Sequence, residues 1–306
     1  MSTAYISHPD FMKHEMGRHH PECPERIAAI EDQLIQSRLD AHLKRIDPPL
    51  ASEADITRVH SEDHLAFVKS KAPSSGYSMI DGDTIMNPAT WTVSLRAAGA
   101  AIAAVDAVMQ GEVNNAFCAI RPPGHHAEPH RSMGFCVFNN VAIATRYAIE
   151  TYGLDRVAVI DFDVHHGNGT EAAFINDPHV LMCSFFQHPF YPYSGLDGGD
   201  NMVNVPLPAS TNGKIVRDMI SKTWIPRLDE FKPQLIIISA GFDAHREDDL
   251  GQMGLVEDDY VWMTKQLMDV ANRYCDGKIV SCLEGGYNLS ALGRSVAAHL
   301  KTLAEI

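Results

Sequence analysis

The chain has 306 residues, and its 25 Lys and Arg against 39 Asp and Glu leave a formal net charge of −14 at pH 7. With 45% hydrophobic and 21% charged residues, it has the composition of a soluble globular protein. The acidic balance argues against a nucleic-acid partner, which would require a basic face or tail.

The amino terminus predicts a cytoplasmic protein. Residues 1–9 contain neither a basic segment nor an apolar one, so they do not resemble a signal peptide. We also expect no membrane partner, because no later stretch approaches the roughly 18 apolar residues of a membrane span. The six cysteines form no Cys-x-x-Cys pair, which predicts reduced, packed thiols and no thiolate zinc site.

Short apolar runs alternate along the chain with longer segments of helical spacing. The apolar runs predict buried strands at residues 116–120, 157–160, 180–184, 235–239 and 278–283. The helical spacing predicts helices at residues 139–152, 212–231, 257–274 and 288–304. Apolar strands separated by helices predict a parallel sheet covered on both faces. Because no linker or repeat divides the chain, residues 1–306 are expected to form a single α/β domain.

Polar motifs follow four of these predicted strands. In a parallel α/β sheet the active site lies beyond the carboxyl ends of the strands, so motifs at several ends are expected to converge. The motifs are Arg121-Pro-Pro-Gly-His-His126 after the first run, Asp161-Phe-Asp-Val-His-His-Gly-Asn168 after the second, Ala240-Gly-Phe-Asp243 after the fourth and Glu284-Gly-Gly-Tyr287 after the last.

The motifs that follow the predicted strands 157–160 and 235–239 together predict a metal site. Alternate residues of an extended chain share a face, so Asp161, Asp163 and His165 point the same way, and Asp243 supplies a further carboxylate. Nitrogen and oxygen ligands without a thiolate suit a catalytic Zn²⁺ that keeps one position for water, although they also suit Fe²⁺ or Co²⁺. The simpler interpretation, helix-capping aspartates beside a loop histidine, explains one motif but not the agreement of four strand ends.

His125, His126 and Tyr287 are the candidates for proton transfer and oxyanion stabilisation. Hydrolysis of an amide needs imidazoles near the attacking water, with partners that fix their tautomers, and Asp161 and Asn168 are suitable partners. A phenol behind two glycines is a suitable donor to a tetrahedral oxyanion. The alternative interpretations are a paired histidine in a surface loop and a glycine turn with a packed tyrosine.

Five longer blocks contain these residues: Arg121-Pro-Pro-Gly-His-His-Ala127, Gly134-Phe-Cys-Val-Phe-Asn-Asn140, Asp161-Phe-Asp-Val-His-His-Gly-Asn-Gly-Thr170, Ser239-Ala-Gly-Phe-Asp243 and Leu283-Glu-Gly-Gly-Tyr-Asn-Leu289. They resemble the signature blocks of the histone deacetylase family, most closely its class II branch and the bacterial deacetylase-like amidohydrolases. With His20-Pro-Glu-Cys-Pro-Glu-Arg26, the resemblance covers nearly the whole chain in order. It implies the arginase/deacetylase fold, with the active site at the carboxyl ends of the strands, and hydrolytic removal of an acyl group from a lysine-like amine.

The resemblance also implies a role for each matching residue. The implied metal ligands are Asp163, His165 and Asp243 for Zn²⁺, and Asp161, Ser184 and the main-chain oxygens of Asp163 and His165 for a K⁺ ion. The implied catalytic residues are His125, His126 and Tyr287, with Asp161 and Asn168 beside the histidines. The implied substrate-binding residues, which line a narrow tunnel for the acyl-lysine stem, are Gly134, Phe135, Tyr191, Leu250 and Gly286.

Two positions depart from the family pattern. Tyr191 stands where the family commonly has Phe, which places a hydroxyl on the tunnel wall. Asp249 stands where a Pro is usual, so the path of that loop is left open. The acidic cluster Glu247-Asp248-Asp249 is expected to be a solvated loop.

The expected substrate is an acyl-lysine peptide or a small acylated amine. Leu250 stands where a polyamine-selective branch carries a Glu, which favours acyl-lysine over acetylpolyamine. An acetylpolyamine amidohydrolase remains the alternative, since it would use the same catalytic machinery. A manganese ureohydrolase such as arginase would need further bridging carboxylates near Asp243, and a binding module would not need His125, His126 and Tyr287. The sequence leaves the oligomeric state and the acyl length open.

Overall fold

A parallel β-sheet of eight strands forms the centre of the protein. The computed structural model, which describes residues 2–306, has the strand order β2-β1-β5-β10-β9-β6-β7-β8, and every neighbouring pair is parallel. A short antiparallel hairpin, β3 with β4, stands apart from it. The strands are β1 Thr3–Ile6, β2 Leu43–Ile46, β3 Ser78–Met79, β4 Ile85–Met86, β5 Asn115–Cys118, β6 Val157–Asp161, β7 Val180–Gln187, β8 Met202–Leu207, β9 Leu235–Ala240 and β10 Ile279–Leu283.

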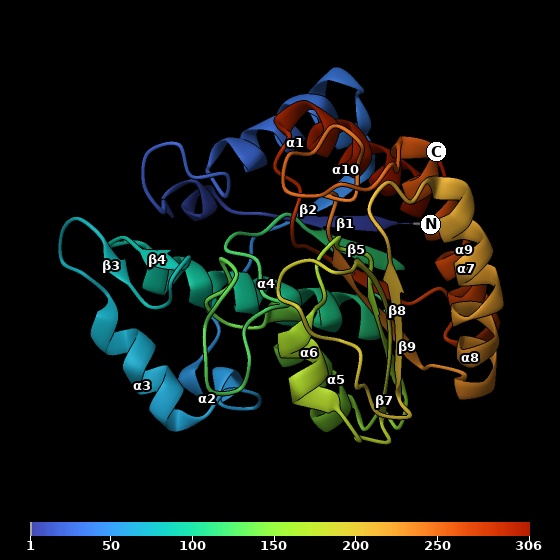
Figure 1. Cartoon of the computed structure of the whole chain (residues 1–306), viewed down its shortest axis with the longest axis horizontal. Helices are drawn as coiled ribbons and strands as arrows, with labels where there is room; N and C mark the ends of the chain where they lie inside the picture. The colour runs from blue at the N-terminus through green and yellow to red at the C-terminus, as the bar shows by residue number, and fades with distance from the viewer. Residues whose placement is uncertain (1) are drawn as a thin grey trace.

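Helices cover both faces of this sheet. Figure 1 shows α1 and α10 side by side on one side of the strands, with α7, α8 and α9 beyond them, whereas α4, α5 and α6 lie on the other side. The α-helices are α1 Glu25–Gln36, α2 Glu53–Ile56, α3 Glu62–Lys71, α4 Thr90–Met109, α5 Asn140–Tyr152, α6 Asn168–Phe174, α7 Gly213–Lys222, α8 Trp224–Phe231, α9 Glu257–Tyr274 and α10 Leu289–Leu303. Two 3₁₀ turns, Pro9–Met12 and Leu39–His42, complete the described elements.

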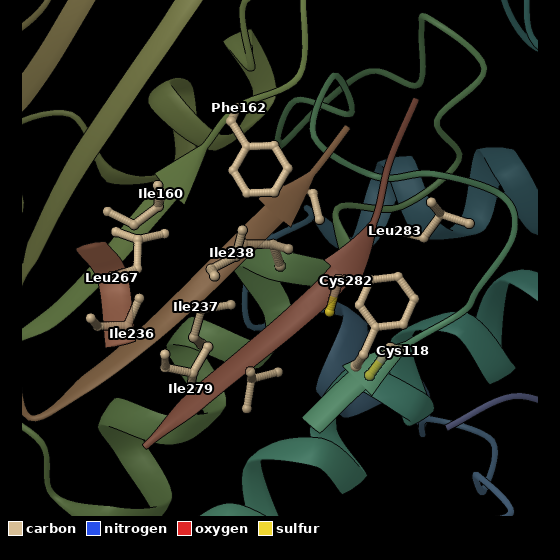
Figure 2. Packing of buried hydrophobic residues seen from close by; sticks show 14 of the residues in the cluster. Cys118, Ile160, Phe162, Ile236, Ile237, Ile238, Leu267, Ile279, Cys282 and Leu283 are labelled. Carbon is tan, nitrogen blue, oxygen red and sulfur yellow. The ribbon is translucent and has the colours of Figure 1, made fainter. Parts of the chain in front are cut away.

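The core lies between these layers and includes β9 at the centre of the sheet. Ile236, Ile237 and Ile238 of this strand are fully buried, and Figure 2 shows them packed among side chains of β6, β10 and α9. Because successive side chains of a strand point to opposite faces, these isoleucines contribute to the packing on both sides of the sheet. Burial of one such side chain stabilises the fold by roughly 1.5–3 kcal/mol.

The predicted fold class and the five predicted strands are confirmed, but one predicted helix is wrong. The segment 212–231 forms two helices, α7 and α8, which meet at Thr223. Pro226 accounts for the break, because its ring would clash with the carbonyl of Lys222 and it cannot donate the helical hydrogen bond. The strands β1, β2 and β8 were not predicted.

Helix α4 corrects the expectation that no stretch is long and apolar enough to span a membrane. Its 20 residues pass that test by length and composition, with a mean hydropathy of 1.4 over the most apolar window. However, 72% of this window is buried inside the protein, where Ala97, Ala101 and Ala104 are fully covered. The same composition is found in the core helices of globular proteins, and α4 packs against β5 and β10 in that way.

The sheet order explains why the polar motifs converge. The strands that precede the four motifs are β5, β10, β9 and β6, and these are consecutive neighbours in the sheet. Because they are parallel, their carboxyl ends lie at one edge. Side chains that are more than 120 residues apart in sequence therefore meet at a single place.

Candidate active site

Three ligating side chains lie together beyond the ends of β6 and β9. One ligand atom from each of Asp163, His165 and Asp243 lies within 4.8 Å of the other two. His165 Nδ1 is 3.0 Å from Asp163 Oδ1 and 3.2 Å from Asp243 Oδ2. Both carboxylates are buried, whereas the His165 side chain is 12% exposed and faces a cavity. This arrangement can hold a metal ion.

The electrostatics of these three residues fit a cation. Burial and the neighbouring Asp163 carboxylate raise the pKa of Asp243 to about 7. Burial opposes charge on His165, but the Asp163 and Asp243 carboxylates outweigh it and raise the pKa of that imidazole to about 10. Within residues 2–306, Asp243 Oδ2 is buried without a hydrogen-bond partner. Two carboxylates and an imidazole without a thiolate are a suitable donor set for Zn²⁺, Fe²⁺ or Co²⁺.

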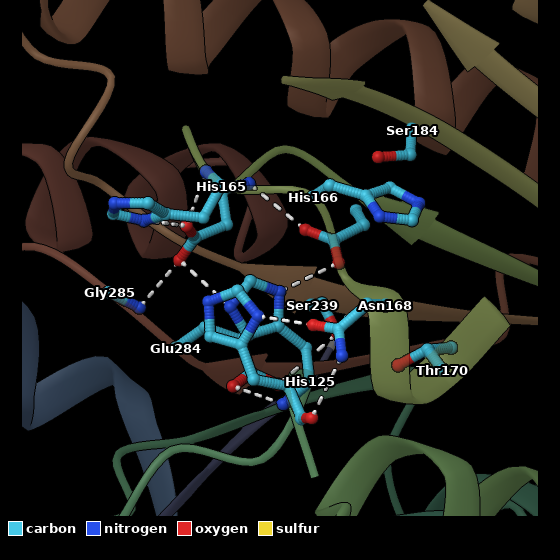
Figure 3. Close-up of polar contacts among 12 residues, drawn as sticks. His125, His165, His166, Asn168, Thr170, Ser184, Ser239, Glu284 and Gly285 are labelled. Atoms are coloured by element: carbon cyan, nitrogen blue, oxygen red, sulfur yellow. Dashed lines mark hydrogen bonds and ion pairs between the residues drawn. The ribbon is translucent and has the colours of Figure 1, made fainter. Parts of the chain in front are cut away.

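The two adjacent histidines have different partners, as predicted. His125 Nδ1 lies 2.9 Å from Asp161 Oδ2, and His126 Nδ1 lies 2.8 Å from Asn168 Oδ1. Figure 3 shows His125, His165 and Asn168 in one group of polar side chains joined by dashed contacts. Since an amide oxygen only accepts, His126 must carry its proton on Nδ1, which leaves Nε2 as a free proton acceptor.

These partners give the two imidazoles opposite pKa shifts. Burial lowers the pKa of His125, but the carboxylates of Asp163 and Asp161 outweigh it and hold that pKa well above its ordinary value. Burial, together with repulsion from His125 and His165, holds the pKa of His126 well below its ordinary value. These shifts favour a neutral His126 and a protonated His125 near neutral pH.

Tyr287 is placed by a glycine loop that follows β10. The Gly285 N–H donates to Asp163 Oδ2 at 2.8 Å, and a side chain at this position would collide with Asp243. Gly286 has φ +117°, which side-chain-bearing residues rarely adopt. Burial raises the pKa of Tyr287 well above its ordinary value, so its phenol keeps its proton and can donate it in a hydrogen bond.

A cavity of about 280 Å³ opens above these groups. Its walls are largely aromatic: the Phe135 and Tyr287 rings meet edge to face at 5.9 Å, and Tyr191 lies edge to face with His126 at 5.3 Å. His126, His165 and Tyr287 line the cavity, so an acyl group bound there would lie beside them. The lining residues are Asp83, His126, Gly134, Phe135, His165, Phe190, Tyr191, Asp249, Leu250 and Tyr287.

The structure brings most of the predicted site residues together, with two exceptions. Gly286 is not one of the described residues that line the cavity. It is buried, and its carbonyl accepts a hydrogen bond from Arg26 Nε at 2.7 Å. Its predicted contact with substrate stays a prediction. Ser184 is the register partner of Asp161 on the neighbouring strand, but its hydroxyl faces the Phe185 carbonyl at 3.4 Å.

The prediction that residues 247–249 form a solvated loop is wrong at Asp248. Glu247 and Asp249 are exposed, but Asp248 is only 6% exposed and accepts hydrogen bonds from three backbone N–H groups. Charge alone suggested a solvated side chain, whereas the donors that stabilise Asp248 lie mostly in a distant part of the sequence.

Three residues that shape the site have no role in the sequence-based predictions, although Glu284 stands in one of the predicted motifs. Glu284 is buried and accepts from the Gly124 N–H at 2.6 Å, which fixes the turn before His125. Asp83, between β3 and β4, accepts from the Gly134 N–H at 2.9 Å. Phe190 stacks on His165 with a ring separation of 5.5 Å. Glu284 followed a predicted strand and could have been assigned, but no periodic pattern marks Asp83 or Phe190.

Comparisons with known proteins agree with this geometry. The histone deacetylase domain matches residues 20–303. The chain is 38% identical over 298 residues to a probable deacetylase of Archaeoglobus fulgidus, covering 94% of this chain and 82% of that protein. It is 36% identical to the polyamine deacetylase HDAC10 of Mus musculus over 325 residues, covering 99% of this chain and 48% of that protein. The solved HDA15 HD domain superposes with a TM-score of 0.94 at 33% identity, covering 99% of this chain and 90% of that one.

Proposed function

This chain belongs to the histone deacetylase family and is a deacetylase hydrolase, and from that premise we propose that it removes an acetyl or other short acyl group from acyl-lysine side chains of proteins or peptides. The observation that carries the proposal is the narrow apolar cavity whose wall includes His126, His165 and Tyr287. In this proposal the aliphatic lysine stem lies against Phe135 and Tyr191, which both line the cavity, and the rest of the peptide stays outside.

The proposed cofactor is one Zn²⁺ ion held by Asp163, His165 and Asp243. Two observations support this choice: Asp243 Oδ2 is buried without a hydrogen bond in the described part of the chain, and the donor atoms are oxygen and nitrogen only. A Zn²⁺ ion bound there would act as a Lewis acid on the amide carbonyl and would make water more acidic. We further propose a K⁺ ion near Asp161 and Ser184, supported by their adjacent places on β6 and β7.

The proposed mechanism assigns each proton to a residue of this chain. His126 Nε2 accepts the proton of the attacking water, because Nδ1 is already committed to Asn168. The Tyr287 phenol donates a hydrogen bond to the oxyanion of the tetrahedral intermediate. The positive charge of His125 stabilises the same developing negative charge. A protonated imidazole then transfers its proton to the leaving nitrogen as the C–N bond breaks, which gives a carboxylic acid and a neutral amine. The acid then loses its remaining proton to the more basic amine, so that a carboxylate and an ammonium are released.

Deacetylation of small polyamines is the second candidate. Asp83 and Asp249 place two carboxylates at the cavity wall, and a carboxylate at the mouth would attract the distant ammonium of an acetylpolyamine. The similarity to a protein named polyamine deacetylase also supports this alternative. Leu250 at the same mouth is apolar and favours acyl-lysine instead.

One assay separates the two candidates. A zinc-loaded preparation is tested against acylated lysine peptides of increasing acyl length and against acetylspermidine, with kcat/KM measured for each. We expect the highest kcat/KM on an acetyl-lysine peptide. A higher value on acetylspermidine would support the polyamine candidate, and no turnover of either substrate class would contradict both.

A further inference from the structure

Asp248 is a buried carboxylate to which the mechanism gives no role. Its Oδ2 accepts from the backbone N–H of Tyr287 at 2.6 Å and of Asn288 at 2.8 Å. Its Oδ1 accepts from the N–H of Leu250 at 3.0 Å. One side chain thus joins the backbone of the proposed oxyanion donor to the wall of the cavity.

The remaining contacts of Tyr287 do not fix its direction. The Arg26 guanidinium lies 4.9 Å from the centre of its ring, and Phe135 touches the ring edge to face. Both are contacts of the ring, whereas the hydrogen bond to Asp248 acts on the backbone N–H of Tyr287 and restrains its main chain. The loop before Tyr287 is held at Gly285 by Asp163, so Asp248 supplies the anchor on the other side of Gly286.

The start of α10 favours a carboxylate at this place. Asn288 caps the helix, since its side chain accepts from the Ala291 N–H, and its own N–H points to Asp248. The N-terminal end of a helix carries partial positive charge, which stabilises an anion there. Asp248 therefore binds the backbone of Tyr287 and Asn288 directly at the start of α10, a helix of 15 residues.

We propose that Asp248 is a positioning residue for Tyr287, and that through Leu250 it also ties the cavity wall to the phenol. The proposal rests on the proposed function, in which Tyr287 stabilises the oxyanion. A displacement of a catalytic group by about 1 Å can cost roughly 10²-fold in rate. Loss of Asp248 should therefore lower kcat much more than it changes KM.

The test is a double-mutant cycle on the zinc-loaded full chain with an acetyl-lysine peptide. Asp248→Asn keeps the size of the side chain but leaves it one acceptor oxygen, and Asp248→Ala removes all three hydrogen bonds. Each variant is measured alone and combined with Tyr287→Phe, together with zinc content and the thermal unfolding midpoint. Glu247→Gln is the matched control, because this exposed neighbour pairs with Arg294 and does not line the cavity.

We expect Asp248→Ala to lower kcat by roughly 10²-fold and Asp248→Asn by less, with KM within about threefold and zinc retained. In the Tyr287→Phe background the same changes should cost no more than about threefold, because the phenol that they misplace is already gone. Equal losses in both backgrounds, a change in KM alone, or an unfolded Asp248→Asn would overturn the proposal. An inert wild type would contradict the proposed function itself, whereas an active wild type with additive losses contradicts only the role of Asp248.

Discussion

The base and the mouth of the cavity are built from different parts of the fold. At the base, Asp163 and Asp243 lie just beyond the ends of neighbouring parallel strands and are fully buried. At the mouth, Asp83, Tyr191 and Leu250 come from three separate loops and are partly exposed. The strand order alone brings the base together, whereas the mouth depends on single contacts such as the hydrogen bond from Gly134 to Asp83.

This difference separates chemistry from selectivity. A change at the base leaves a buried charge or donor without its partner, which is costly, so the reaction type is hard to alter. A side chain substituted at the mouth stays in contact with water, and its charge is screened, so the substrate preference is easier to alter. Substitutions at the base should therefore affect turnover by orders of magnitude, and those at the mouth only by small factors.

The largest effect is expected at the metal-binding group. Asp163→Ala or Asp243→Ala should lose both the bound metal and the activity, because each removes one of three protein ligands. Metal analysis of the purified variants, beside the activity assay, measures this directly. Asp269→Ala, which removes an exposed carboxylate of α9, is the matched control and should keep both. Full zinc occupancy in either ligand variant would mean that the ligand set is wrong.

The same contrast explains what the sequence could predict. The base could be predicted because β6 and β9 contain runs of four apolar residues that lead directly into their motifs. The edge strands β2 and β8 contain charged or polar residues, so they show no apolar run. Pro226, in the first turn of α8, is the sequence signal for the break between α7 and α8.

The residues that escaped prediction depend on contacts between distant segments. The proposed role of Asp248 depends on the N–H groups of Tyr287 and Asn288, which lie 39 and 40 residues later in the chain. No local sequence pattern predicts these contacts. Asp83 lies in a hairpin whose strands have two residues each, too short for periodicity to be visible. Motif resemblance named the chemical groups, but only the folded chain shows which loops surround them.

The second prediction concerns the oxyanion donor above the base. Tyr287→Phe should fold and retain zinc but lower kcat by roughly 10²- to 10³-fold, since one donor to the oxyanion is lost. Steady-state kinetics on an acetyl-lysine peptide measures the loss, and metal analysis confirms that the base is intact. Near wild-type turnover would make Tyr287 a packing residue of the cavity wall.

The third prediction changes the charge beside the proposed base. Asn168→Asp places a carboxylate against His126, which stabilises the imidazolium and should raise its pKa. Because the base must be neutral to accept a proton, the acid limb of the kcat/KM profile should move to higher pH. The two histidines are adjacent, so this limb belongs to the coupled pair.

The Asn168 amide also donates to Glu128 at 2.7 Å, so the substitution would bring two carboxylates together. The profile is therefore best measured in a Glu128→Gln background, with Glu128→Gln alone as the control. An acid limb that does not move, with zinc content intact, would show that residue 168 does not set the protonation of the base.

The smallest effect is expected at the mouth, where Leu250→Glu tests selectivity. A carboxylate at this partly exposed position would attract the distant ammonium of acetylspermidine, and a solvated ion pair contributes roughly 0.2–1 kcal/mol. The ratio of kcat/KM for acetylspermidine to that for an acetyl-lysine peptide should therefore rise by no more than about fivefold. Leu250→Gln is the control for side-chain shape, and it should leave the ratio nearly unchanged. The gain should shrink at high ionic strength, because exposed charges are screened.

If the wild type already prefers acetylspermidine, Asp83 and Asp249 outweigh Leu250, and Asp249→Asn should then lower the ratio. A change of orders of magnitude in any of these variants would mean that the mouth is as rigid and desolvated as the base, and the contrast between the two regions would be wrong.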